Sequence, residues 1–273
     1  QLGLAEGIYK GMGNVGSAVA AVTLPTIALM FGGDDGWRYA TAITGVIALI
    51  FAVIYYRSVS DTPAGSTYFR PNKSGGLEVT SKRDFFFCLA LNIPMFGALA
   101  VLTWKVTTLG LLTEFTSYVI YAALVGQYLF QASQLFKVNK DMFKTPVDEI
   151  LQYNFKQVAI LSIAYAVTFG AELAVVSMLP LFFKDTFLIP VALAGLFGAS
   201  FAVIDVISCP SGGFISDTFG RKKTLATLLS GAAVGFFIMS LITPEWPIAL
   251  AVASMMFCSF FLGSAAGSVF AVV

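Results

Sequence analysis

A few polar residues stand inside long apolar runs, and their types could do chemistry. Glu172 and Asp205 are acids in such runs; a carboxylate at membrane depth is costly, so each is a functional candidate by default. The alternative is that each only hydrogen-bonds a neighbouring helix. Tyr165 and Phe169 lie on or near the helical face of Glu172, where an aromatic stripe more often packs than binds a ligand. Asp205 shares a helical face with Cys209.

The sequence contains few residues that could bind a metal ion or a cofactor. The chain has no histidine, and Cys88, Cys209 and Cys258 are far apart, with no CxxC pair. A disulfide framework, a zinc site, a haem or an iron–sulfur cluster is therefore not expected, and a membrane-embedded redox enzyme is disfavoured as a function. We expect no metal, no cofactor and no enzymatic activity.

The glycine-rich stretch GMGNVG, which begins at Gly11, offers a different chemistry. It matches the G-x-G-x-x-G dinucleotide fingerprint, but that site requires a preceding strand within a βαβ unit, and here an apolar span follows. Gly13 and Ser17 could instead let another helix approach closely. In a sharper interpretation Gly11, Gly13 and Gly16 expose backbone beside a cavity, and Asn14 donates its amide to a bound anion.

The elements that position these residues are membrane-spanning helices. The 273 residues have a mean hydropathy of +0.84 and are 58% apolar and 11% charged, whereas soluble domains carry roughly 25% charged residues. The net charge of +1 gives no argument for a nucleic-acid partner. No run alternates like a barrel strand, and backbone in lipid must satisfy its own hydrogen bonds. We expect an all-α polytopic membrane protein in contact with lipid, with about eight spans of about 20 residues or more, at 11–31, 39–56, 84–104, 115–134, 158–183, 189–215, 224–242 and 247–273.

The lysines and arginines predict the orientation of these spans. If the first span runs from inside to outside, 13 of the 16 basic residues lie in inside segments, Lys10 among them, which satisfies the positive-inside rule. Two inside stretches are long and polar. Residues 57–83, rich in Gly, Pro, Ser and Thr, are typical of a linker, and residues 135–157, of mixed charge, could form an interfacial helix.

A last motif, GFISDTFGRK, begins at Gly213 and lies between two spans. A short basic loop there could be only a topology anchor. Its spacing indicates more, because Asp217 can meet a helix N-terminal dipole or pair with Arg221, and Gly220 permits a tight turn. With Lys222, the pattern resembles the G-x-x-x-D-x-x-G-R-R/K gating loop of the major facilitator superfamily, which is specific for that superfamily but carries no information on substrate.

Through these motifs and the others given below, the whole chain resembles the nitrate/nitrite porters of that superfamily, in particular the cyanobacterial nitrate permease branch. The first glycine-rich stretch is similar to the nitrate signature on the fifth helix of those porters. The residues that carry the resemblance are GMGNVGSA at 11–18, GGDDGWRYA at 32–40, Tyr165 with TFG at 168–170, CPSGGFISD at 209–217 and GSAAGSVFAVV at 263–273.

The resemblance implies a twelve-helix core of two halves with an anion site near the midplane, of which this chain is a fragment. Its expected parts are the last two helices of the N-terminal half at 1–60, cytoplasmic segments around an inserted transmembrane hairpin (84–134) at 61–157, and the first four helices of the C-terminal half at 158–273. The residues that the resemblance places at the substrate are Gly11, Gly13, Asn14, Gly16, Tyr165, Phe169 and Cys209.

The resemblance also implies a function and a location. The protein is expected to be a monomeric, multi-pass secondary transporter of a bacterial plasma membrane (inner membrane). It would move nitrate, and also nitrite, by alternating access. Proton coupling is part of that expectation, with Glu172 and Asp205 as the proton sites.

Cys209 is the position where this sequence departs from the family pattern, in which an arginine precedes the Pro-x-Gly-Gly. A buried arginine can hold planar nitrate through a bidentate fork, whereas a cysteine has no fixed charge. Losing such a contact costs about 2–5 kcal/mol, or about 30- to 4,000-fold in affinity. We therefore expect weakened nitrate transport or altered selectivity, with another small anion or a carboxylate as the alternative substrate. Restoring arginine at 209 should raise uptake.

Overall fold

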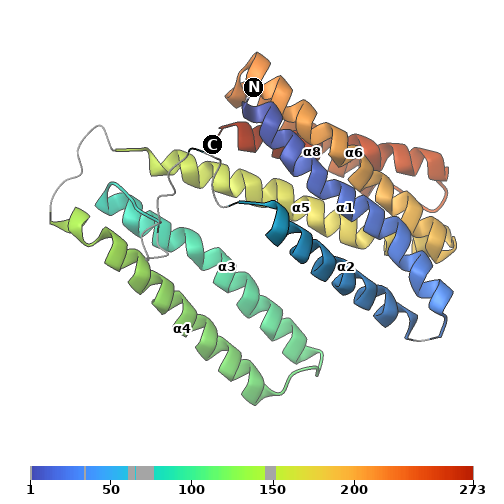
Figure 1. Ribbon diagram of the computed structural model, residues 1–273, viewed down its shortest axis with the longest axis horizontal. Coiled ribbons are helices and arrows are strands. Elements are labelled where there is room, and N and C mark those ends of the chain that lie inside the picture. The colour runs from blue at the N-terminus through green and yellow to red at the C-terminus, as the bar shows by residue number, and fades with distance from the viewer. Residues whose placement is uncertain (1, 34, 61–64, 66–76, 145–151, 273) are drawn as a thin grey trace. The chain divides into compact units, whose positions relative to one another are not determined.

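The computed structural model describes residues 2–33, 35–60, 65, 77–144 and 152–272, and all regular structure in these ranges is helical (Figure 1). This confirms the all-α prediction. A short 3-10 helix, η1, covers Asp141–Phe143. The long helices are α1 (Leu2–Phe31), α2 (Gly36–Ser58), α3 (Lys82–Thr108), α4 (Glu114–Asn139), α5 (Phe155–Phe187), α6 (Val191–Phe219), α7 (Arg221–Ser240) and α8 (Ile248–Val272).

Seven of these described helices are long and apolar enough to cross a membrane, and α4 is the exception. It covers the span expected at 115–134, but three glutamines in its second half lower its hydropathy. It still forms an antiparallel hairpin with α3 (Figure 1). The ring of Tyr128 lies 5.5 Å from that of Phe96, and its hydroxyl donates to the Leu89 carbonyl at 3.3 Å. The predicted hairpin therefore exists as a packed pair of helices.

The chain divides into two compact units, one formed by residues 1–60 with 161–273 and the other by residues 61–160. In the second unit, the segment that precedes α3 is held in place by one side chain at the end of α4 and one beyond it. Asn139 accepts from the Val79 N–H at 2.7 Å and donates to the Leu77 carbonyl at 2.9 Å. The Tyr153 hydroxyl donates to the Glu78 carbonyl.

The described residues of the predicted linker and of the predicted interfacial helix lie at the ends of the neighbouring helices and in short segments beside them. The first begins as the end of α2 and finishes in the anchored segment and the start of α3, while residues 61–64 and 66–76 lie outside the described part of the chain. In the second, the described residues form the end of α4 and η1, and residues 145–151 lie outside the description. No helix over the whole of 135–157 is present among the residues described.

In the first unit, α6 lies between α1 and α8, and glycines let both neighbours reach its backbone. A Cβ atom on Gly7 of α1 would lie 2.6 Å from the Cys209 carbonyl oxygen, and one on Gly267 of α8 would overlap the same oxygen. Real Cβ atoms essentially never come so close, so these helices contact one another backbone to backbone. Residue 209 therefore lies where three helices approach most closely.

An apolar core fixes the other side of α6. Phe183 of α5, Phe201 of α6 and Met255 and Leu262 of α8 are almost completely buried in one cluster. Burying a large apolar side chain stabilises a packed structure by dispersion contacts even where lipid is the solvent. This core and the glycine contacts position the polar residues of α6 relative to α1 and α5.

Candidate functional site

The candidate site is built around Lys10, which from the sequence alone is one of the basic residues of an inside segment. Lys10 lies in the third turn of α1, inside an apolar span. Its side chain is 9% exposed, and its ammonium forms an ion pair with Glu172 Oε2 of α5 at 2.8 Å. A lysine four residues before Asn14 shares its helical face, and that spacing was the signal in the sequence that could have identified it.

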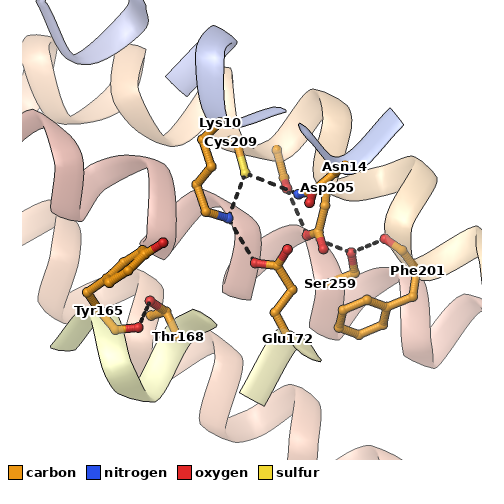
Figure 2. A network of polar contacts seen from close by, with 10 residues as sticks. Lys10, Asn14, Tyr165, Thr168, Glu172, Phe201, Asp205, Cys209 and Ser259 are labelled. Carbon is orange, nitrogen blue, oxygen red and sulfur yellow. Dashed lines mark hydrogen bonds and ion pairs between the residues drawn. The ribbon is translucent and has the colours of Figure 1, made fainter. Parts of the chain in front are cut away.

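Lys10 and Asn14 both reach Cys209 from α1 (Figure 2). The Lys10 Nζ donates to the Cys209 Sγ at 3.5 Å, and the Asn14 Nδ2 lies 3.9 Å from the same sulfur. Cys209 is completely buried. A second helix therefore brings a lysine ammonium next to the residue where the family pattern has an arginine.

A cavity of about 290 Å³ opens beside the ion pair. The rings of Tyr165 and Phe169 form one wall, stacked 5.3 Å apart and within 7° of parallel, and Lys10 Nζ lies 6.0 Å from the Phe169 ring centroid. Asn14 and Glu172 also face the cavity, so five polar or aromatic residues from two helices converge on one space. The full lining is Lys10, Gly13, Asn14, Ser17, Tyr165, Phe169, Glu172, Leu173, Val176 and Ala202.

Asp205 lies behind this cavity, in the contact between α6 and α8. Its side chain is completely buried, and its Oδ1 accepts from Ser259 at 3.0 Å and from Ser208 at 3.4 Å. Its Oδ2 has no hydrogen-bond partner within the described part of the chain. The two candidate acids therefore differ, since Glu172 lines the cavity and Asp205 does not.

Gly11, Gly13 and Gly16 of α1 lie in three different environments. Gly11 faces α6, where a Cβ would lie 2.8 Å from the Val206 carbonyl oxygen, so it serves helix packing and exposes no backbone to the cavity. Gly13 lines the cavity, and Gly16 is exposed outside it. Close packing through Gly13 and Ser17 is not observed in the described chain, because the buried face of α1 passes through Gly7 and Gly11.

The expected gating loop is a single residue. Gly220, with φ of 93°, is the one residue between α6 and α7; a positive φ favours glycine. The Asp217 carboxylate accepts from the Leu4 N–H at 3.2 Å, so it meets the N-terminal turn of α1. Gly213 packs against the α1 backbone. Arg221 and Lys222 are exposed in the first turn of α7.

Comparisons with known proteins agree with this architecture. The sequence profile of the Major Facilitator Superfamily matches residues 1–273. The nitrate/nitrite transporters NrtP of Picosynechococcus sp. and Nostoc punctiforme are 43% and 38% identical to this chain, and each alignment covers 100% of the chain and 56% of the relative. The chain thus spans little more than half the length of these relatives. No solved structure matches it. Because the profile covers the whole chain and the helices form a glycine-packed membrane bundle, the chain belongs to the Major Facilitator Superfamily.

Proposed function

We propose that this chain is part of a secondary transporter that moves nitrate and nitrite across a bacterial plasma membrane by alternating access. One observation carries the proposal: a lysine ammonium, almost buried in an apolar span, stands at the edge of a cavity. A cation at such depth is costly and usually faces a substrate pathway. The names of the two relatives support nitrate or nitrite as the anion.

The cavity provides complementary groups for a small planar anion. The Lys10 ammonium has three donors, and the Asn14 amide adds two more, both from the α1 side of the cavity. The stacked rings of Tyr165 and Phe169 provide a flat, largely apolar wall. A planar anion can lie against those rings while its oxygens accept from Lys10 and Asn14.

A second candidate is a transporter of a small carboxylate, and the Lys10–Glu172 pair favours it. Lysine is a compact point charge and, unlike arginine, does not impose the geometry of a planar fork. In this site the ammonium already binds a carboxylate oxygen at 2.8 Å. Competition of unlabelled nitrate, nitrite and formate against labelled nitrate distinguishes the two, because a carboxylate carrier is inhibited most strongly by formate.

Replacing Lys10 tests the proposed site in the full-length transporter. Lys10→Met keeps the length of the side chain and removes its charge, so the KM for nitrate should rise about 30-fold or more, the effect of losing roughly 2 kcal/mol of a buried charge contact. Lys10→Arg should retain uptake. Lys184→Met, at an exposed lysine on α5, is the matched control. A Lys10→Met protein with the KM of the wild type contradicts the proposal.

A further inference from the structure

The Lys10–Glu172 ion pair lies in the substrate cavity itself, so the proposed substrate site already contains a bound anionic group. Both side chains line the cavity, and they are 9% and 5% exposed. The carboxylate oxygen lies at hydrogen-bond distance from the ammonium. An incoming anion must therefore share or take a donor that Glu172 uses.

A carboxylate is chemically similar to the proposed substrates. It holds two oxygens on one trigonal atom, as nitrite does and as one edge of nitrate does, and in each ion both oxygens accept hydrogen bonds. A donor that binds one of these ions can therefore also bind the others. Glu172 is attached to α5, so it competes for Lys10 at a high effective concentration.

The charges that face Glu172 limit the site to one anion at a time. Lys10 faces it from α1, Cys209 and Asp205 lie on α6, and α8 contributes only the hydroxyl of Ser259, which is bonded to Asp205. On its own helix Tyr165 and Phe169 lie on the same side. Among the described residues of this cluster Lys10 is the single cation. A bound anion next to an ionised Glu172 would leave the buried cluster with an uncompensated negative charge, which is costly at this depth.

We propose that Glu172 is a built-in competitor for the anion site, which holds Lys10 when substrate is absent and takes up a proton when substrate replaces it. The empty carrier then contains a neutral Lys10–Glu172 pair. The loaded carrier contains a neutral Lys10–anion pair beside a protonated Glu172. One proton enters with each anion, so the empty and the loaded carrier have the same net charge in this buried cluster. This inference rests on the proposed function.

Replacing Glu172 by glutamine separates binding from the return of the empty carrier. Glu172→Gln removes the competing charge, so the KM for nitrate exchange should fall by about 5- to 150-fold, the usual range for coupled ligands. The empty site of the variant would then contain an unpaired lysine, and this charge opposes the return of the empty carrier across the membrane. Net uptake should therefore be lost, while exchange of internal for external nitrate continues. Exchange by the variant should not respond to external pH, whereas in the wild type acidification should lower the KM.

The experiment uses the full-length transporter in proteoliposomes, with exchange and proton-gradient-driven net uptake measured in parallel. Asp185→Asn, at an exposed acid on the same helix, is the matched control and should leave both activities and their ratio unchanged. If Glu172→Gln does not fold, as shown by its thermal stability in detergent, the pH dependence of the wild-type exchange KM decides: a KM that falls on acidification supports the proposal, and an unchanged KM overturns it.

The outcomes separate this inference from the proposed function. A folded Glu172→Gln protein with the exchange KM and the net-to-exchange ratio of the wild type overturns the role of Glu172 and leaves nitrate transport standing. A wild-type protein that neither exchanges nor accumulates nitrate overturns the proposed function itself. Loss of exchange in the variant along with net uptake also contradicts the competitor, because it would make Glu172 a required ligand.

Discussion

The most informative test moves the positive charge of the site from residue 10 to residue 209. The sequence alone predicts that Cys209→Arg raises nitrate uptake. The structure predicts the opposite while Lys10 is present, because the sulfur that an arginine Cγ would replace lies 3.5 Å from the Lys10 ammonium. The double variant Lys10→Ala with Cys209→Arg removes that conflict and retains one cation opposite Glu172.

The magnitude follows from the geometry. The guanidinium of an arginine lies three bonds beyond Cγ, so its charge would be about 6 Å from the ammonium, where two like unit charges repel by about 3 kcal/mol at an effective dielectric constant of about 20, or about two decades in an equilibrium constant. The backbone at residue 209 cannot move away from Lys10, because Gly7 and Gly267 pack against its carbonyl. We therefore expect Cys209→Arg to fall below the wild type in uptake or in folded protein, and the double variant to exceed both single variants.

The assay is a double-mutant cycle on the full-length transporter. Initial rates and the KM for nitrate are measured for the wild type, both single variants and the double variant, normalised to folded protein in the membrane. Residues in contact typically show interaction energies of about 0.5–3 kcal/mol, whereas distant ones add to within about 0.5 kcal/mol. Additive effects, or a Cys209→Arg protein that equals or exceeds the wild type with Lys10 retained, would refute the reasoning.

Three further predictions test the packing and the polar contacts. Gly267→Ala places a Cβ into the Cys209 carbonyl and should lower the thermal unfolding temperature in detergent. Gly126→Ala is its control, because a Cβ there meets nothing within 4 Å. This variant should leave the unfolding temperature unchanged or raise it, since alanine has the better helix propensity. Asn14→Ala removes an amide donor from the cavity and should raise the KM for nitrate by about 2- to 13-fold, equivalent to about 0.5–1.5 kcal/mol, in the same uptake assay. Asn139→Ala leaves the buried Val79 N–H without its acceptor and should destabilise the α3–α4 unit by about 1–3 kcal/mol; faster proteolysis before α3 than in the wild type would show this.

Much of the helical architecture could be predicted from the sequence, because it depends on local composition. Long apolar runs with few charges predict helices wherever backbone must satisfy its own hydrogen bonds, and the glycine at 220 predicts the break between α6 and α7. The helix at 114–139 shows the limit of that reasoning. Its glutamines keep it below the apolarity of the other described helices, although the sequence predicts its position, at 115–134, and its pairing with α3.

Part of the candidate site was also visible in the sequence. Asn14, Tyr165, Phe169 and Glu172 were identified individually from their types, and the structure brings them to one cavity. Gly11 was assigned to the cavity although it packs against α6. The sequence shows that a glycine permits close approach, but the helix that approaches is chosen by residues far along the chain.

The amino-acid sequence is enough to predict a helical membrane protein with isolated polar groups in its spans and a cysteine where a charge was expected. The packing of the helices then shows that Lys10 supplies a charge there. Its partners, Glu172 and Cys209, lie 162 and 199 positions away, and helical periodicity relates residues only within a few turns of one another. The contact arises because Gly7 and Gly11 bring α1 against α6, so backbone packing decides which side chains share the buried site.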